Sequence, residues 1–246
     1  MKVIGVIPSR LSSSRLSKKP LAEISGIPMI AHVIERSKLC KGLDDLYIAT
    51  DSIEICEVAK QHNCKYFLTS KDHATGTDRI GEIISLIDAD IIVNIQGDEA
   101  LVRPSDIEAS FKLLIDRPNL DMGMLTTNFN KSSSPSDIKV ILNQLNEIIC
   151  FSRGDIPYQQ NSNSKNFLKA FHVVSFRKKA LKNFCSLEQT PIEKIESIEY
   201  MRAVENNIKI GCKVVESNAI SVDTPSDLEI VKKLMKEDQL SKKYLK

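Results

Sequence analysis

Hydrophobic residues fall into short uninterrupted runs that alternate with longer segments of helical spacing. Runs typical of strands lie at 3–7, 46–50, 66–68 and 91–95. Segments that predict helices lie between them, at 28–39, 52–61 and 77–87. Strands separated by helices imply right-handed crossovers, so this half of the chain predicts a mostly parallel sheet with helices on both faces.

The pattern changes after about residue 120, where strands follow one another with little helix between them. Strands are predicted at 122–127, 139–142, 147–151, 170–176 and 208–215. Residues 143–146 suit a hairpin turn, and helices are expected near 177–185 and at 191–205. Thr224 followed by Pro225 marks the start of a final helix. We therefore predict an α/β fold with one domain over 1–246 and a smaller β-rich insertion at approximately 120–180.

Charge is nearly balanced over the chain but not along it. The 246 residues carry 34 Lys and Arg against 32 Asp and Glu, a net charge of +2. The first 22 residues hold five of these bases and no acid, which leaves 29 bases and 32 acids elsewhere. A general nucleic-acid binder normally has a clear basic excess, so this function is not expected.

Cysteine spacing and hydropathy indicate where the protein works. The six cysteines form no C-x-x-C pair, so we expect ordinary thiols in a reducing compartment rather than disulfides or a zinc site. No apolar stretch approaches the roughly 20 residues of a membrane span. We expect a cytoplasmic protein with no membrane insertion.

The basic residues gather in the loop that follows the first predicted strand. Residues 8–21 contain Arg10, Arg15, Lys18 and Lys19, several serines and no acid. This loop leaves the carboxyl end of a buried strand, where open α/β sheets bind ligands, and its donors suit a polyphosphate. The alternative is a solvated basic loop. No G-x-G-x-x-G sequence is present, so a nucleotide here would be held by side chains.

Two carboxylates lie at the ends of predicted elements, in separate loops. Asp98 follows the strand at 91–95 and Asp223 precedes the last helix. Carboxylates that face a phosphate-binding loop suit Mg²⁺, although each could also be a solvated group or a helix cap. The segment 73–79 could contact a base or sugar, or form a capping turn. The four histidines form no close cluster with a nucleophile, and we expect them to be structural.

These segments resemble, in the same order, those of one enzyme family, the 3-deoxy-manno-octulosonate cytidylyltransferases, or CMP-KDO synthetases. The matching segments cover most of the chain: 7–21, 26–37, 48–51 (IATD), 75–80 (TGTDRI), 93–99 (VNIQGDE), 151–158 (FSRGDIPY), 192–202 and 222–229 (VDTPSDLE). The resemblance implies a nucleotide-diphospho-sugar transferase-like fold. It also implies a Mg²⁺-dependent transfer of CMP from CTP to the anomeric hydroxyl of KDO. The products would be pyrophosphate and CMP-KDO for lipopolysaccharide synthesis.

The resemblance also assigns roles to individual residues. The implied nucleotide-binding residues are Arg10, Ser13, Arg15, Lys19, Thr77, Arg79 and Gln96. The implied catalytic residues are Arg10, Lys19 and Asp98, and the implied metal ligands are Asp98 and Asp223. The implied sugar-binding residues are Arg153, Glu196 and Glu199. The expected partners are CTP, a sugar acid and a second copy of the chain.

Departures from the family pattern fall mainly on the acceptor side. A His, a Tyr and a Gln of the family are replaced by Ala170, Val174 and Tyr200. Losing polar contacts to a sugar can change discrimination by orders of magnitude. Two alternatives therefore stay open: transfer of CMP to a different ulosonic acid, and a nucleotide-binding paralogue without activity. The intact Arg10, Lys19, Asp98 and Asp223 argue against the second.

Overall fold

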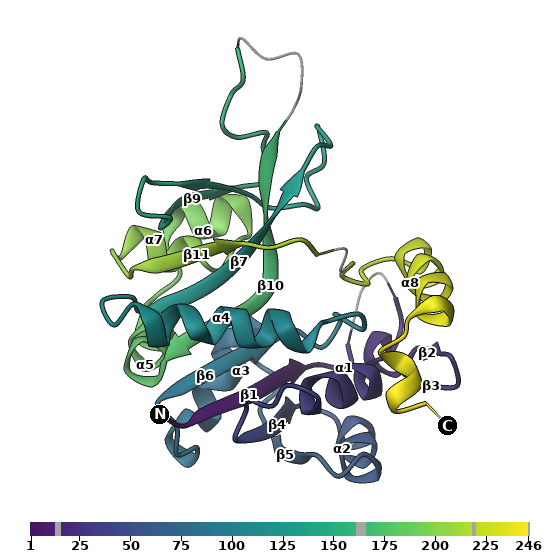
Figure 1. The fold of residues 1–246 in the computed structure, drawn as a ribbon. Helices are drawn as coiled ribbons and strands as arrows, with labels where there is room; N and C mark the ends of the chain where they lie inside the picture. The colour runs from purple at the N-terminus through teal and green to yellow at the C-terminus, as the bar shows by residue number, and fades with distance from the viewer. Residues whose placement is uncertain (13–15, 161–165, 218–219, 246) are drawn as a thin grey trace. The chain divides into compact units, whose positions relative to one another are not determined.

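The computed structural model describes residues 1–12, 16–160, 166–217 and 220–245. The chain divides into two compact units (Figure 1). Unit 1 comprises residues 1–108 and 218–246, and unit 2 comprises residues 109–217. Whether the chain acts as one domain with an insertion at 120–180 stays a prediction.

Unit 1 contains a parallel sheet with the strand order β6-β1-β4-β5. Its strands are β1 (Val3–Ser9), β4 (Asp45–Thr50), β5 (Lys65–Leu68) and β6 (Ile91–Ile95). Every residue of β1 and β6 is buried, as the uninterrupted apolar runs predict for strands covered on both faces. A two-stranded hairpin, β2 (Glu23–Ile24) with β3 (Ile27–Pro28), lies outside this sheet.

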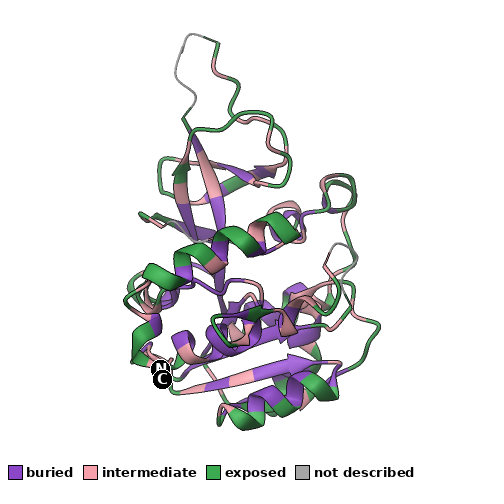
Figure 2. Ribbon diagram, turned by 90° about the vertical axis from the view of Figure 1, so that its right-hand side faces the viewer, coloured by how far each residue is buried: buried purple, intermediate pink, exposed green. Residues whose placement is uncertain are grey.

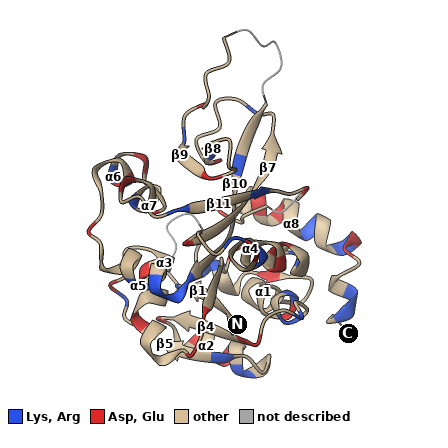
Figure 3. Cartoon of the chain, turned by 60° about the vertical axis from the view of Figure 1, so that its left-hand side comes forward, with Lys and Arg blue, Asp and Glu red and all other residues tan. Residues whose placement is uncertain are grey.

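The strand order places helices on both faces of the unit 1 sheet. The helices are α1 (Met29–Lys38), α2 (Ile53–Gln61), α3 (Gly76–Ile83) and α8 (Pro225–Glu237). Because β1, β4 and β5 advance in one direction, right-handed crossovers put α1 and α2 on one face. The return from β5 to β6 puts α3 on the other, and Figure 3 shows α1 and α3 on opposite sides of β1. Buried residues concentrate on the strands and on the inward faces of the helices (Figure 2).

The last helix packs against the segments that follow β1 and β6. Val222 and the α8 residues Leu228, Val231 and Met235 form one buried cluster with Ile24, Met29, Ala100 and Leu101. Thr224 Oγ1 caps α8 by accepting from the Asp227 backbone N–H, and the Thr224 N–H donates in turn to the Asp227 carboxylate. The predicted start of this helix is confirmed, and its capping box fixes the backbone beside Asp223.

Unit 2 is built on three neighbouring strands in the order β11-β7-β10. They are β7 (Met122–Phe129), β10 (Phe167–Arg177) and β11 (Ile210–Val214), with β7 antiparallel to β10 and parallel to β11. The antiparallel pair β8 (Lys139–Leu142) and β9 (Ile148–Ser152) extends from β10. The predicted turn at 143–146 joins this pair, since Asn143 donates its N–H to the Glu147 carbonyl.

The helix predicted at 191–205 is wrong, because the structure contains two helices there. The helices after β10 are α5 (Lys178–Ser186), α6 (Pro191–Glu196) and α7 (Met201–Glu205). Ser197 adopts a left-handed conformation with φ 52° and ends α6. In one continuous helix, Glu193 and Arg202 would lie on opposite faces and about 13.5 Å apart along the axis. The break lets them form a buried bidentate ion pair of 2.7 and 2.9 Å.

Three further observations complete the fold. Helix α4 (Pro104–Asp116) spans the boundary between the units. The segment predicted as one helix at 77–87 ends as α-helix at Ile83 and continues as a 3₁₀ turn, Ile84–Leu86. All six cysteines are free thiols, and none of the helices in the described ranges is long and apolar enough to cross a membrane.

Candidate functional site

A cleft of about 280 Å³ opens in unit 1 beyond the carboxyl ends of β1 and β6. It is lined by polar residues from four segments of the chain: Ser9, Arg10, Ser12, Lys19, His73, Thr75, Arg79, Gln96, Asp98 and Asp223. Ligands of open α/β sheets bind at this edge, because the loops after neighbouring parallel strands meet there. The cleft therefore joins the basic loop and both carboxylates that the sequence analysis selected.

The centre of the cleft is an ammonium group between two carboxylates. Lys19 Nζ donates to Asp98 Oδ2 at 2.7 Å and to Asp223 Oδ1 at 3.3 Å. Burial of the ammonium acts to lower the pKa of Lys19, but the two carboxylates outweigh burial, so the net shift is upward. Lys19 is therefore held protonated, and residues far apart in the sequence converge at one point.

Local structure explains why Lys19, and not Lys18, reaches the carboxylates. Lys18 adopts a left-handed conformation with φ 48° just before the 3₁₀ turn Lys19–Leu21. Its ammonium binds Glu54 at the surface, 2.8 Å away. Asp98 comes close because Gly97 precedes it: a Cβ on Gly97 would lie 3.1 Å from the Pro8 carbonyl oxygen. The loops after β1 and β6 can therefore pack backbone against backbone.

The predicted triphosphate loop is only partly described. Arg10 follows β1 directly, is exposed and lines the cleft. Lys19 ends the loop inside the cleft, with a side chain that is only 17% exposed. Ser13 and Arg15 lie outside the described residues. Two of the four predicted loop residues thus lie at the cleft.

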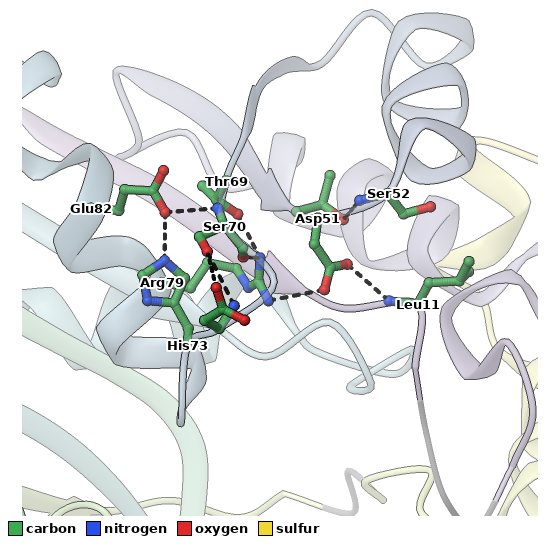
Figure 4. Close-up of polar contacts among 10 residues, drawn as sticks. Leu11, Asp51, Ser52, Thr69, Ser70, His73, Arg79 and Glu82 are labelled. Atoms are coloured by element: carbon green, nitrogen blue, oxygen red, sulfur yellow. Dashed lines mark hydrogen bonds and ion pairs between the residues drawn. The ribbon is translucent and has the colours of Figure 1, made fainter.

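Arg79 is buried and connects the loops that surround the cleft. Its guanidinium donates to Thr69 Oγ1 (2.5 Å), the Ser70 carbonyl oxygen (2.9 Å) and Asp51 Oδ2 (3.2 Å). The other oxygen of Asp51 accepts the Leu11 backbone N–H at 3.2 Å, so the carboxylate lies between Arg79 and the basic loop (Figure 4). Arg79 therefore positions the loop that carries Arg10.

Asp51 has a role that the sequence analysis did not assign. The N-cap of α2 is Ser52, whose side chain makes no capping bond, so Asp51 lies just before the helix and is not its cap. The available signal was the place of Asp51, directly after a buried strand in the matching segment IATD. A carboxylate there can neutralise an arginine that approaches from the next loop.

Thr77 does not line the cleft but lies beneath it. Its side chain is fully buried and accepts from Asn94 Nδ2 at 3.0 Å. Asn94, also fully buried, accepts in turn from Gln96 Nε2 at 3.2 Å. Gln96 lines the cleft, so this chain of hydrogen bonds fixes the orientation of its amide from below. Both Thr77 and Gln96 were predicted to bind the nucleotide, and of this pair only Gln96 lines the cleft.

His73 lies at the rim of the cleft and is bonded to Glu82. Its Nε2 lies 2.5 Å from Glu82 Oε2, which also accepts the Ser70 N–H (Figure 4). Burial acts to raise the pKa of Glu82, but the bonds from His73 and Ser70 outweigh it and lower the pKa overall. Of the two alternatives for 73–79, the structure contains the capping turn, because Thr75 caps α3. A contact with base or sugar stays a prediction.

The predicted sugar-binding residues Arg153 and Glu196 lie together in unit 2. Glu196 accepts from Ser152 Oγ (2.7 Å) and from the Arg153 N–H (2.9 Å). Burial acts to raise the pKa of Glu196, but these bonds outweigh it and lower the pKa. Glu199 lies three residues further on and is half-buried.

The Arg153 guanidinium donates to three backbone carbonyls, those of Pro135, Glu196 and Ser197. Its nitrogens lie 2.8 to 3.1 Å from these oxygens. The side chain thereby holds two loops of unit 2 together and keeps Glu196 in place. Arg153 thus has a clear positioning contact within its own unit.

The three departures from the family pattern are buried in unit 2. Ala170, Val174 and Tyr200 are each less than a tenth exposed. The Tyr200 ring packs between Phe151, Phe176 and Phe184, with centroids 6.2 to 6.4 Å away. The β10–β7 pairing shifts register between Phe171 and Val174, so the strand bulges at the two residues between them. The backbone of β10 is therefore irregular beside Ala170 and Val174, where the sequence departs from the family pattern.

The donor set of the cleft fits a magnesium ion. Asp98 and Asp223 already share one cation, the Lys19 ammonium, so their oxygens converge on a point of positive charge. The described ranges contain no group of three or more His, Cys, Asp or Glu that could hold a metal. Mg²⁺ is commonly bound by one or two carboxylates with substrate phosphates and water as the other ligands. Two aspartates beside a basic loop meet that description.

Comparison with known sequences gives matches along nearly the whole chain. The family model described as cytidylyltransferase matches residues 4–210. The 3-deoxy-manno-octulosonate cytidylyltransferase of Escherichia coli is 36% identical over 239 residues, 96% of this chain and 97% of the relative. The protein of the same name from Francisella tularensis strain SCHU S4 is 38% identical over 242 residues, 93% and 96% of the two chains.

Solved structures share the fold. The structure of CMP:2-keto-3-deoxy-manno-octonic acid synthetase complexed with CTP matches with a TM-score of 0.92 at 36% identity. The match covers 96% of this chain and 99% of the other. A cytidylyltransferase from Leptospira borgpetersenii matches with a TM-score of 0.68 at 18% identity, which bears on the fold alone. The predicted α/β fold of nucleotide-diphospho-sugar transferase type is confirmed.

Proposed function

The chain belongs to the 3-deoxy-manno-octulosonate cytidylyltransferase family, and from this premise we propose that it transfers CMP from CTP to KDO. The reaction is a nucleotidyl transfer that yields CMP-KDO and pyrophosphate. The observation that carries the proposal is the cleft at the end of β1, where Lys19, Asp98 and Asp223 converge beside Arg10.

The triphosphate of CTP is assigned to the basic side of the cleft. Arg10 and Lys19 supply charge-assisted donors, and Arg10 is exposed where a phosphate could reach it. Gln96 is assigned to the nucleotide, because its amide is oriented through Asn94 and Thr77. Ser13 and Arg15 are assigned to the triphosphate on sequence alone. Arg79 is assigned a positioning role through Asp51.

The chemistry requires one bond to form and one to break at the α-phosphorus. The anomeric oxygen of KDO attacks this phosphorus and its hydroxyl proton passes to water, while the bond to the pyrophosphate oxygen breaks and pyrophosphate leaves with the electron pair. Catalysis of such transfers depends on positioning and charge neutralisation rather than on covalent participation of the protein. Lys19 and Arg10 are placed to neutralise charge that develops on the phosphates.

Mg²⁺ is the proposed cofactor, and Asp98 and Asp223 are its proposed protein ligands. When bound, the ion would neutralise phosphate charge and hold phosphate oxygens in place. Lys19 touches both aspartates, so its ammonium keeps them together while no other cation is near.

The acceptor is assigned to unit 2 residues. Arg153, Glu196 and Glu199 lie there, with the carboxylate of Glu196 held ionised by the hydrogen bonds that it accepts. Their roles rest on the family resemblance. KDO is the proposed acceptor because relatives that match this chain over nearly their full length are named 3-deoxy-manno-octulosonate cytidylyltransferases.

Two further proposals concern the setting of the reaction. We propose that the chain works in the cytoplasm, where CTP is available and where free thiols such as these six persist. We also propose a homodimer formed through unit 2. Exposed apolar side chains on its hairpin and on α6 support this: Leu145, Ile149, Ile192 and Ile195.

The test is an acceptor panel with purified protein, CTP and Mg²⁺. Pyrophosphate release is measured with KDO, with an amino-substituted analogue and with a nine-carbon ulosonate. We expect the highest kcat/KM with KDO and loss of release in Asp98→Ala. Release with another acid but not with KDO would contradict the proposed acceptor. Binding of CTP with no release from any acid would identify a nucleotide-binding paralogue.

A further inference from the structure

The loops that carry Asp98 and Asp223 are bonded to each other directly behind the two carboxylates. The Val222 N–H donates to the Asp98 carbonyl oxygen at 3.1 Å. The residues next to them in sequence form a second bond between the two loops, in which Ser221 Oγ donates to Glu99 Oε1. Asp98 is therefore followed by Glu99, and Asp223 is preceded by Val222, and each of these neighbours is hydrogen-bonded to the opposite loop.

Glu99 is suited to hold a loop in place rather than to bind substrate. It is only 1% exposed and follows Asp98 immediately. Its own N–H donates to the Gln96 carbonyl, and its carbonyl accepts the Val102 N–H. Glu99 therefore sits in a tight turn whose shape fixes the direction of the preceding carboxylate.

Arg36 of α1 forms a second connection between the loop that carries Asp98 and the segment that contains Asp223 and α8. Arg36 is 2% exposed and donates to the carbonyl oxygens of Val102 (2.7 Å) and Leu101 (3.2 Å). Its third bond, 2.7 Å long, goes to Asp238, directly after α8. Arg36 thus joins the end of the Asp98 loop to the end of the helix that Asp223 precedes.

We propose that the Ser221–Glu99 hydrogen bond, beneath Asp98 and Asp223, sets the separation of these two carboxylates for a divalent cation bound with CTP. Ser221 and Glu99 are positioning residues, which act through the loops and not on the substrate. The inference rests on the proposed function, since it concerns the metal of that reaction. Groups that orient metal ligands from behind typically change metal affinity or activity about 10- to 100-fold when they are mutated.

The test compares Ser221→Ala with Ser221→Thr, which keeps a hydroxyl donor. Ser226→Ala is the matched control, because Ser226 lies in the same segment but bonds Thr224 instead of Glu99. Mn²⁺ binding is followed by electron paramagnetic resonance with saturating CTP and no acceptor, so CTP is not consumed. CTP binding in EDTA is measured by calorimetry, and Tm is recorded for every variant.

We expect Ser221→Ala to weaken Mn²⁺ binding about 10-fold or more while CTP binding in EDTA and Tm stay close to wild type. Ser221→Thr should restore most of the affinity, and Ser226→Ala should not change it. Wild-type Mn²⁺ affinity in Ser221→Ala would overturn the proposal. An equal loss of metal-free CTP binding would also overturn it, because the hydrogen bond would then be structural only. Failure of the wild-type protein to bind CTP at all would instead contradict the proposed function.

Discussion

The ammonium nitrogen of Lys19 lies 2.7 Å from a carboxylate oxygen of Asp98, although 79 residues separate the two in sequence. The contact links the loop after β1 to the loop after β6, and Asp223 adds a second carboxylate at 3.3 Å. One lysine thus neutralises two acids in a cleft that has no other described cation within bonding distance of both. Lys19 is therefore the residue whose replacement should affect substrate binding and the metal ligands together.

Replacing Lys19 by Met should lower kcat/KM for CTP by about 100-fold or more, as is typical when a charged donor to a transition state is lost. The variant also leaves Asp98 and Asp223 facing each other without the ammonium, so its Tm should rise more with Mg²⁺ than that of the wild type. Pyrophosphate release and thermal scans with and without Mg²⁺ measure the two effects.

Lys18→Met is the control, because Lys18 binds Glu54 at the surface. The kcat/KM of this variant should stay within about threefold of wild type. Equal losses in both variants would show that general loop charge, and not the Lys19 contact, matters.

A second prediction concerns acid stability and His32. Burial lowers the pKa of His32 below 6.5, and although the Ile24 carbonyl acts to raise it, the nearby Arg36 acts with burial. The unfolded chain therefore binds a proton in a pH range where the folded chain does not. The contribution of His32 to the free energy of unfolding is complete above pH 6.5 and falls as the pH drops from 6.5 through the folded pKa.

For one proton, this loss is at most about 1.4 kcal/mol per pH unit. Urea unfolding between pH 7.5 and 5 should show the slope, and His32→Gln should reduce it. His62→Gln, which removes a half-buried histidine that binds Glu35, should keep the larger part of the slope. An unchanged slope in His32→Gln would assign the acid sensitivity to other groups.

A third prediction separates the acceptor side from the nucleotide side. Arg153→Gln removes a guanidinium that donates to three carbonyls around Glu196. We expect the KM for KDO to rise about 10-fold, because Glu196 loses the guanidinium bonds that hold its loop in place, while the KM for CTP changes little. Initial rates with each substrate varied in turn provide the measurement. A rise in the KM for CTP alone would contradict the assignment of Arg153 to the acceptor.

Much of the fold follows from local patterns, because burial on both faces leaves few choices for an apolar run. The runs at 3–7 and 91–95 are strands, and Thr224 with Pro225 begins a helix, as predicted. The break at Ser197 was not predictable, since serine does not favour a left-handed conformation and the break is stabilised by the Glu193–Arg202 pair, which forms only once the helix is broken between them. Tertiary contacts outweighed local propensity there.

The residues of the site likewise fall into those that could be identified from the sequence and those that could not. Lys19, Asp98 and Asp223 could be selected because charged residues at the ends of buried elements commonly bind ligands. Thr77 and Arg79 could be selected only as sequence matches, and their hydrogen bonds with Asn94 and Asp51 depend on how separate loops pack. Glu99 and Ser221 gave no signal as a pair, because 122 residues separate them.

The last prediction tests the proposed homodimer through Ile195 of α6. Its side chain is 81% exposed, an unusual position for a large apolar group on a surface helix that carries a second exposed isoleucine, Ile192. If this face lies in a dimer interface, Ile195→Glu would place a charge in an apolar contact. The dissociation constant should then rise about 30-fold, which corresponds to a loss of about 2 kcal/mol. Sedimentation velocity over a range of concentrations measures this shift.

Leu86→Glu is the control, because Leu86 is 68% exposed but lies in unit 1. This variant should leave the assembly unchanged. Equal dissociation in both variants, or a wild-type protein that is monomeric at every concentration, would contradict an interface on α6.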